Sequence, residues 1–278
     1  MQNPNALCAC ENCPCDKKCS CENTEVASAM AVSTREPLNQ RLPVKSLAGM
    51  TLEHADTVLS LVSIAENSTT SYEKAYNYAE RNSYDSNIRG VTVGIVGFTT
   101  GTGDLLMVIQ ALQKINPKHS LVKYIPALKK VNGSGSNNGI ENLIPDIKKL
   151  GKDVQWRQAQ WEIINKLYWN PAIAKANDLG LKNVISKGQL YDTILNFGNL
   201  NLIKRIKALP PSKKGDEVAW LNEFLDIKET IVTKEDKSLT DGNPDRVKMW
   251  RSILKSKNVK LSRPINNLVC YGDKFSIV

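Results

Sequence analysis

The sequence predicts a mainly α-helical fold with one small β-sheet. Apolar residues recur at helical spacing in several separate segments, whereas the alternation typical of a strand occurs in one region only. The chain has 278 residues, of which 41% are hydrophobic, and this is enough to bury a large core in one domain or two lobes. No stretch approaches the roughly 20 consecutive apolar residues that a membrane helix needs.

The folded body is expected to begin near Leu52. From there to Ala65 the apolar residues keep helical spacing, and Asn67-Ser68 interrupts the pattern. Glu66 is therefore expected at the C-terminal end of a partly buried helix. Partial burial favours the protonated form of a carboxylic acid, which is the form that a proton donor requires.

A strand is predicted from Val91 to Phe98, where larger apolar residues alternate with small ones. The following Gly101-Thr102-Gly103-Asp104 predicts a turn, with Asp104 as the cap of a helix over 105–115. The glycines of this region are not followed by Gly-Lys-Ser/Thr and lack the Rossmann spacing, which disfavours a phosphate cradle.

The second half of the chain is strongly helical. A loop rich in Gly, Ser and Asn precedes it at 132–139. Asn170-Pro171 is a favourable helix start, and Gly180 is a plausible helix end. The predicted helices lie over 156–167, 170–180, 184–195 and 218–225.

Six of the seven cysteines lie within the first 21 residues. Disulfides among them would close very small loops with poor geometry, whereas shared thiolate coordination of a soft metal suits the spacing. The run Cys8-Ala9-Cys10-Glu11-Asn12-Cys13-Pro14-Cys15 resembles the opening of bacterial metallothioneins, although the later Cys and His ligands of that family are missing. Residues 1–23 are therefore expected to bind Zn²⁺ or Cu⁺, with a tail of reactive thiols as the alternative. The six candidate ligands are Cys8, Cys10, Cys13, Cys15, Cys19 and Cys21.

Residues 24–50 contain Ser, Thr, Pro and Ala with few bulky apolar residues, and are expected to form a flexible linker. The catalytic domain is expected to cover residues 51–278.

The formal net charge of +9 suggests a polyanion as partner, but the lysines are spread along the chain rather than gathered in one block. A nucleic-acid-binding function would rest on this charge alone. The chain has only two histidines and no Gly-x-Ser-x-Gly elbow, so a serine hydrolase is disfavoured. Carboxylates are the better candidates for catalysis, and a glycosidase needs two of them.

Several blocks resemble, in order and at matching spacings, the chitosanases of glycoside hydrolase family 46. The resemblance runs from about residue 50 to the C-terminus. It implies a two-lobed, lysozyme-like fold with a cleft between the lobes, and internal cleavage of β-1,4-linked glucosamine chains with inversion. The blocks are SIAENS at 63–68, RGVTVGIVGFTTGTGD at 89–104, YIPALKKVNGS at 124–134, QAQ at 158–160, YD at 191–192 and WLNEFLD at 220–226.

The resemblance implies that Glu66 is the general acid. The family's second carboxylate is an aspartate two residues before Arg-Gly, and this position is Asn87 here. An asparagine cannot take a proton, so Asp85, the only aspartate nearby, is assigned as the general base. Thr92 matches the threonine that helps to position the attacking water.

Other residues match the family's binding or supporting groups. Asp104 and Asp192 match acidic residues that bind amino sugars or support the acid; the alternatives are a helix cap for Asp104 and an ion-pair partner of Arg246 for Asp192. Arg246 matches an arginine behind the catalytic glutamate. Lys228 stands where a second arginine is usual, which keeps the charge but loses the bidentate fork. The remaining candidate binding or supporting residues are Arg89, Asn87 and Glu235.

The predicted function is that of an inverting endo-chitosanase that needs no cofactor for catalysis. The expected partner is chitosan or a partly acetylated glucosamine polymer, with no nucleic acid or membrane, and the protein is expected to be a monomer. Because chitosan is cationic, the cleft is expected to be acidic, through Glu66, Asp85, Asp104 and Asp192. The alternative function is non-catalytic glycan binding on the same fold, suggested by the displaced Asp85.

The compartment is left open. The family is usually secreted, but Met-Gln-Asn-Pro and the residues after it lack the basic and apolar regions of a secretory signal.

Overall fold

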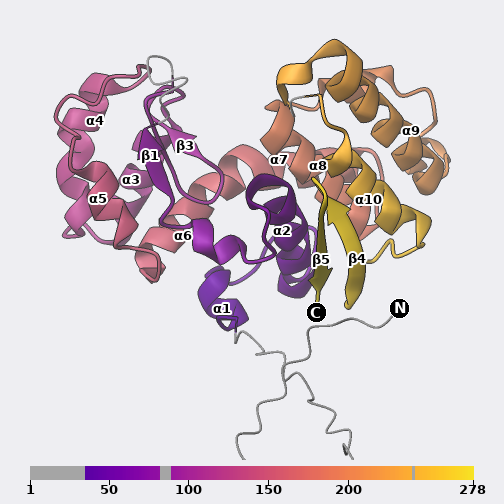
Figure 1. The fold of residues 1–278 in the computed structure, drawn as a ribbon, viewed down its shortest axis with the longest axis horizontal. Coiled ribbons are helices and arrows are strands. Elements are labelled where there is room, and N and C mark those ends of the chain that lie inside the picture. The colour runs from indigo at the N-terminus through magenta and orange to yellow at the C-terminus, as the bar shows by residue number, and fades with distance from the viewer. Residues whose placement is uncertain (1–34, 82–88, 240–241) are drawn as a thin grey trace, which may run out of the picture. The chain divides into compact units, whose positions relative to one another are not determined.

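A computed structural model describes residues 35–81, 89–239 and 242–278 (Figure 1). The mainly α-helical fold predicted from the sequence is confirmed. Within these ranges no helix is long and apolar enough to cross a bilayer. The helices are α1 (Leu38–Arg41), α2 (Leu52–Asn67), α3 (Asp104–Ile115), α4 (Ile125–Val131), α5 (Leu143–Lys148), α6 (Val154–Ile164), α7 (Asn170–Asp178), α8 (Val184–Phe197), α9 (Glu217–Thr230) and α10 (Asp245–Lys255).

Two small antiparallel sheets complete the fold. One has the order β1-β2-β3, with β1 at Ala79–Arg81, β2 at Val91–Val93 and β3 at Phe98–Thr99. The other is a hairpin of β4 (Ile265–Cys270) and β5 (Asp273–Ile277).

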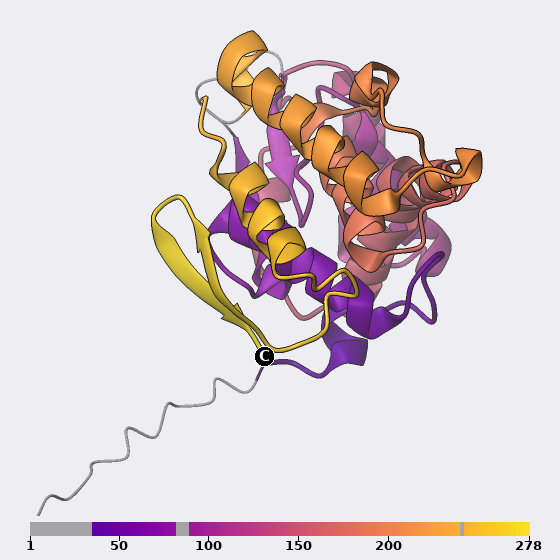
Figure 2. The ribbon, with the colours of Figure 1, turned by 90° about the vertical axis from the view of Figure 1, so that its right-hand side faces the viewer.

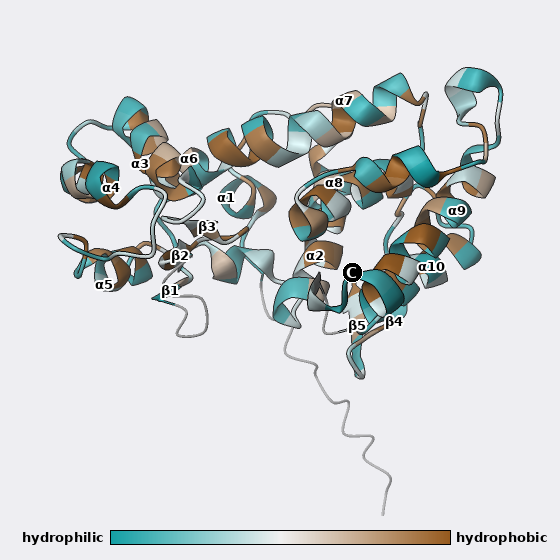
Figure 3. Cartoon of the chain, turned by 90° about the horizontal axis from the view of Figure 1, so that it is seen from above, coloured by the Kyte–Doolittle hydropathy of each residue, from teal (hydrophilic) through white to brown (hydrophobic). Residues whose placement is uncertain are grey.

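The elements of residues 35–278 form two groups, which correspond to the two expected lobes. One contains the β1-β2-β3 sheet with α3, α4 and α5, and the other contains α8, α9, α10 and the hairpin (Figure 1). Figure 3 shows α6 and α7 running from one group to the other. A π-helical turn, Asn165–Trp169, joins these two helices, and its Trp169 is fully buried.

Helix α2 is a core helix. Every residue from Ala55 to Ala65 is buried, so the helix has no solvent-exposed stripe along this length. The Thr51 side chain caps its start by accepting a hydrogen bond from the backbone N–H of His54, and Ser68 ends it in the left-handed conformation. Glu66 is the first residue of the helix to emerge from the core, as the sequence predicted.

The single strand predicted over 91–98 is wrong in detail. The chain forms two short strands, β2 and β3, around a turn at 94–97. Gly94 and Gly97 have φ angles of 77° and 74°, which favour glycine. The turn rests on α6, because the backbone N–H of Ile95 donates to Gln160 Oε1 at 3.0 Å, and a Cβ on Gly94 would lie 2.3 Å from the same oxygen.

Residues 35–50, which were assigned to a linker, are folded onto the body. Leu42 is fully buried and Leu47 nearly so. Ion pairs fix the rest of this segment to the body, and the hydropathy pattern of a sequence does not reveal ion pairs. Arg157 of α6 binds the Glu36 side chain, and Arg41 binds Asp56 of α2.

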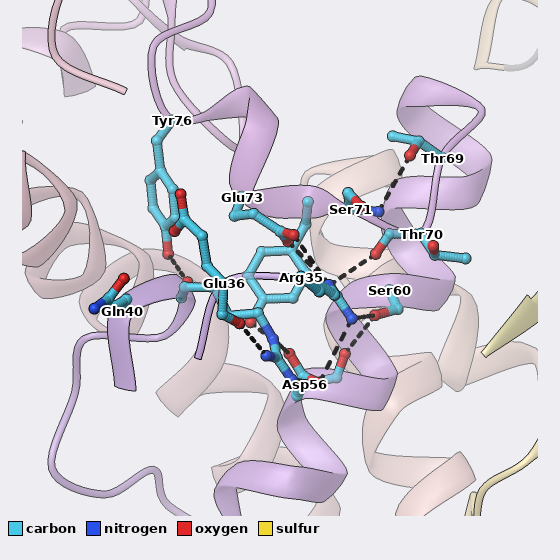
Figure 4. A network of polar contacts seen from close by, with 12 residues as sticks. Arg35, Glu36, Gln40, Asp56, Ser60, Thr69, Thr70, Ser71, Glu73 and Tyr76 are labelled. Atoms are coloured by element: carbon cyan, nitrogen blue, oxygen red, sulfur yellow. Dashed lines mark hydrogen bonds and ion pairs between the residues drawn. The ribbon is translucent and has the colours of Figure 1, made fainter. Parts of the chain in front are cut away.

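Asp56 is the centre of this network (Figure 4). It is only 1% exposed, and its oxygens accept hydrogen bonds from Arg41 and the Tyr72 hydroxyl at 2.7 Å and from Arg263 at 2.5 Å. Arg35 lies 3.7 Å away. Burial by itself raises the pKa of Asp56, but the hydrogen bonds from Arg41, Tyr72 and Arg263 lower it to about 2.

Asp56→Asn is expected to lower the free energy of unfolding at pH 7 by about 3 kcal/mol, because three partly buried arginines lose their counter-ion. The folded pKa of about 2 lies below the ordinary 3.8, so the ionised form stabilises the fold above pH 4. About 2 kcal/mol of that stability is lost as the pH falls through 2. Urea unfolding of both proteins at several pH values measures this difference.

Asp178→Asn is the matched control, since this carboxylate is 72% exposed and lies 3.9 Å from Lys175. It should change stability by less than about 0.5 kcal/mol at any pH. An Asp56→Asn protein as stable as the wild type would contradict the role given to this network.

Candidate active site

A cleft with a volume of about 480 Å³ opens beside the C-terminal end of α2. Its walls come from α2, from the turn between β2 and β3, and from the end of α8. Both groups of elements therefore contribute to it. Polar residues in the wall include Ser63, Glu66, Asn67, Arg89, Thr92, Tyr78, Tyr191 and Asn196.

Glu66 is positioned by the core helix that carries it. Its side chain is 44% exposed, and one oxygen accepts a hydrogen bond from Arg246 Nη1. Since the preceding residues are buried in the core, the backbone of Glu66 has little conformational freedom. Its carboxyl group can therefore contact a ligand in the cleft while it stays hydrogen-bonded to Arg246.

Arg246 links Glu66 to a second carboxylate. The Nε and Nη2 atoms of Arg246 donate to Asp192 Oδ1 at 2.9 and 2.7 Å. Asp192 has no exposed surface. Burial alone raises the pKa of Asp192, but the positive charges of Arg246 and Lys228 hold it below its usual range. Asp192 is therefore ionised and fixes the orientation of the guanidinium.

Lys228 completes this group from α9. It is fully buried, and its Nζ lies 2.5 Å from Asp192 Oδ2 and 3.1 Å from Thr193 Oγ1. A lysine thus fills the place that the resemblance gave to a second arginine. The buried set contains two cations, Arg246 and Lys228, around one buried carboxylate, and Arg246 also contacts the half-exposed carboxyl group of Glu66.

Thr92 and Arg89 line the same cleft as Glu66. Thr92 is the middle residue of β2 and pairs with Glu80 of β1 and Thr99 of β3, so neighbours on both sides fix its backbone. Glu66 and Thr92 thus lie around one cleft, and their catalytic roles stay predictions. Asp85 and Asn87 lie outside the described residues, and the identity of the general base stays a prediction.

Asp104 is buried next to the turn that joins β3 to α3. Its Oδ1 accepts hydrogen bonds from the backbone N–H of Thr99 at 2.6 Å and from the Thr102 hydroxyl at 2.7 Å. The Tyr168 hydroxyl lies 3.4 Å from its other oxygen. It stands at the first position of α3 and does not line the cleft.

Glu235 is also outside the cleft wall. It forms a bidentate pair with Arg205 at 2.7 and 2.8 Å, and both side chains are well exposed. Of the four carboxylates expected to make the cleft acidic, only Glu66 is in the described wall, where Arg89 is the one basic residue. Asp85 lies outside the described residues, so the overall charge of the cleft stays a prediction. Asp104 and Asp192 are absent from this wall because each is buried and already engaged with protein groups.

Several polar residues of the cleft were not predicted from the sequence, among them Ser63, Tyr78 and Asn196. Ser63 could have been found, because it precedes Glu66 by three positions and such residues share a helix face. In the described ranges no cluster of three or more His, Cys, Asp or Glu could hold a metal. The six N-terminal cysteines lie outside those ranges.

The sequence matches the model for Glycosyl hydrolase family 46 over residues 60–265. The chain belongs to this family. Two chitosanases match most of the length of this chain. The chitosanase of Streptomyces sp. (strain N174) is 34% identical over 245 residues, which is 84% of this chain and 86% of the relative. The chitosanase of Bacillus subtilis (strain 168) is 34% identical over 241 residues, covering 79% and 83% of the two chains.

Solved structures agree with the family 46 assignment. The native chitosanase from Bacillus subtilis MY002 superposes with a TM-score of 0.71 and 32% identity, covering 81% of this chain and 98% of the other. A mutant of that enzyme was solved with six glucosamine units, at a TM-score of 0.70 with the same coverage. The Gynuella sunshinyii enzyme, solved with chitotetraose, gives 0.71 at 29% identity, covering 82% and 99%.

Proposed function

We infer that this protein is an endo-chitosanase that hydrolyses β-1,4 bonds between glucosamine units with inversion. The observation that carries this inference is Glu66, held by Arg246 at the exposed end of a core helix, in a cleft that Thr92 also lines. Family membership and the substrates bound to related structures support the same activity. The chain spans more than four-fifths of both curated relatives.

In this mechanism the protonated Glu66 gives its proton to the glycosidic oxygen as the bond to the anomeric carbon breaks. A water attacks that carbon from the opposite face, and a carboxylate base takes the proton from the water. Glu66 is left ionised, and the Arg246 guanidinium stabilises that negative charge. The Thr92 hydroxyl can hold the water, since it can donate one hydrogen bond and accept others.

We assign Asp85 as the base. An inverting enzyme separates its two carboxyl groups by about 6.5–9.5 Å, which leaves room for the attacking water. Asn87 stands where the family's aspartate is expected, but an amide does not accept the proton at neutral pH. Its role is at most to orient the water or the sugar.

Non-catalytic glycan binding on the same fold is the second candidate, because Asn87 replaces the expected base. The two candidates differ in their products. An endo-chitosanase lowers the viscosity of soluble chitosan as reducing ends appear, whereas a binding protein does neither.

The N-terminal cysteines are proposed to form a separate metal-binding segment. Three closely spaced Cys-x-Cys pairs supply soft thiolate ligands, which suit Zn²⁺ or Cu⁺. The acid–base chemistry of Glu66 and Asp85 needs no metal, so the two functions are independent.

Glu66→Gln is expected to reduce the turnover of soluble chitosan by at least about 100-fold, because the amide cannot donate the proton. Circular dichroism and thermal unfolding should remain near those of the wild type. Glu235→Gln is the matched control, since this carboxylate lies outside the cleft wall, and it should keep full activity. If Glu66→Gln retained more than a few per cent of the activity, Glu66 would not be the acid.

Asp85→Asn is expected to lose activity severely, whereas Asn87→Ala should be the milder change. Only a carboxylate can take the proton from the attacking water. Steady-state rates on glucosamine hexamers compare the two variants. A severe loss in Asn87→Ala together with near-normal Asp85→Asn would reverse the assignment.

Removing residues 1–34 should leave the turnover of chitosan and the melting temperature nearly unchanged. The cut is placed before Arg35, because the following residues are anchored to Asp56 and Glu73. The full chain, purified under reducing conditions, should carry Zn²⁺ or Cu⁺ that the shortened chain lacks, as measured by elemental analysis. Chelation should remove that metal without slowing hydrolysis. Chelator-sensitive turnover would show that a metal takes part in catalysis.

A further inference from the structure

Few large aromatic side chains of this protein are exposed. All five tryptophans are at most 1% exposed. Among the described tyrosines, only Tyr78 and Tyr271 are well exposed, at 41% and 37%. Tyr78 is in the wall of the cleft, whereas Tyr271 lies in the turn of the β4-β5 hairpin. The position of this turn relative to the cleft therefore decides what the exposed ring of Tyr271 can bind.

The hairpin begins near the start of α2. Just before β4, Arg263 donates to Thr57 Oγ1 at 2.9 Å and to Asp56 Oδ2 at 2.5 Å. Strand β5 packs on α2, and β4 packs on α10. Figure 2 shows the two yellow strands side by side, with their turn at the end away from the C-terminus. The turn is therefore at the opposite end of the hairpin from Asp56.

The charges that act on the turn identify its surroundings. Burial raises the pKa of the Tyr271 hydroxyl, while the positive charge of Arg246 lowers it and the negative charge of Glu66 raises it. Burial also raises the pKa of the neighbouring Cys270 thiol to about 11, and the charges of Asp245 and Arg246 act on it in opposite directions. Coulomb interactions weaken with distance, so the turn lies beside Arg246 and Glu66. Tyr271 is thus at the rim of the cleft, next to the proposed proton donor.

The backbone of the turn is strained at Tyr271. The turn has two residues, Tyr271 and Gly272, because Cys270 pairs with Asp273 across the hairpin. Their φ angles are 51° and 87°, and positive φ at both positions is the pattern of a type I′ turn, which favours Asn-Gly. A tyrosine adopts such a φ angle only at a cost in free energy. Strain of this kind is typical of functional sites, and here it holds an aromatic ring at the rim of the cleft.

We propose that the Tyr271 ring is a platform on which a pyranose ring of the substrate stacks, where the polysaccharide chain leaves the cleft beside Glu66. The inference rests on the proposed chitosanase activity. In β-1,4-linked glucosamine the large substituents are equatorial, so each pyranose ring presents flat faces of C–H groups. An aromatic ring offers such a face a large apolar contact. The equatorial ammonium group stays at the edge of the stacked pair, where it keeps its water shell.

Tyr271→Trp makes the stacking contact measurable by fluorescence. Because the native tryptophans are buried, this variant places the one exposed indole of the described residues at position 271. In a Glu66→Gln background, which prevents turnover, the glucosamine hexamer should change the emission of the Tyr271→Trp protein. The same background without Tyr271→Trp is the control and should show almost no change. If calorimetry detected hexamer binding to the Tyr271→Trp protein without a change in emission, the inference would be wrong.

Affinity separates the ring of Tyr271 from its hydroxyl. Tyr271→Asn keeps a residue that suits the turn but removes the ring, so hexamer affinity and kcat/KM should each fall about fivefold. Tyr271→Phe keeps the ring and should stay within about twofold of the wild type. Lys257→Asn is the matched control, since Lys257 is exposed, has a φ angle of 61° and lies beyond the opposite end of α10 from Arg246. Unchanged affinity in Tyr271→Asn would overturn the inference, and so would an equal loss in Tyr271→Phe, because it would assign the role to the hydroxyl.

Failure of the proposed function would look different. A wild-type protein that does not hydrolyse chitosan refutes the catalytic function, whatever Tyr271 does. Calorimetry and fluorescence then still decide the role of Tyr271, because both measure binding without turnover. Absence of any hexamer binding would refute both proposals together.

Discussion

The structure depends on the burial of one negative charge, that of Asp192. A carboxylate without solvent must be paired, and two cations from distant parts of the chain, Lys228 and Arg246, provide this. Their pairing brings α8, α9 and α10 together. Arg246 Nη1 donates to Glu66, so the need to neutralise Asp192 also positions the proposed proton donor. The interactions that stabilise the fold thus include the one that orients Glu66.

Helix α2 is held near both ends by charges. Asp56, near its start, binds arginines from before α2 and from after α10, and Glu66, at its end, binds Arg246. Between them lies a stretch that is buried on all sides. A helix fixed in this way presents Glu66 to the cleft with little positional freedom, and preorganisation of this kind is what acid catalysis requires.

Much of the fold could be predicted from the sequence, because helical spacing reports burial directly. This holds for α2, α3, α8 and α9, and for Glu66 at a helix end. Helical spacing does not predict segments that ion pairs hold in place. Residues 35–50 are mostly polar, yet the ion pair between Arg41 and Asp56 fixes them to the body. Asp104 and Asp192 were expected in the cleft because residue type alone cannot distinguish a carboxylate that meets a ligand from one already satisfied by protein donors.

The Asp56 network has a topological consequence. Arg263 binds both Asp56 and the carbonyl oxygen of Val278, the last residue, while Arg35, the first described residue, lies 3.7 Å from the same carboxylate. The two ends of the body thus meet at one point. Ends that meet in this way permit circular permutation. A short peptide could join residue 278 to residue 35, and new termini could open at the exposed turn around Lys213, leaving every buried pair intact.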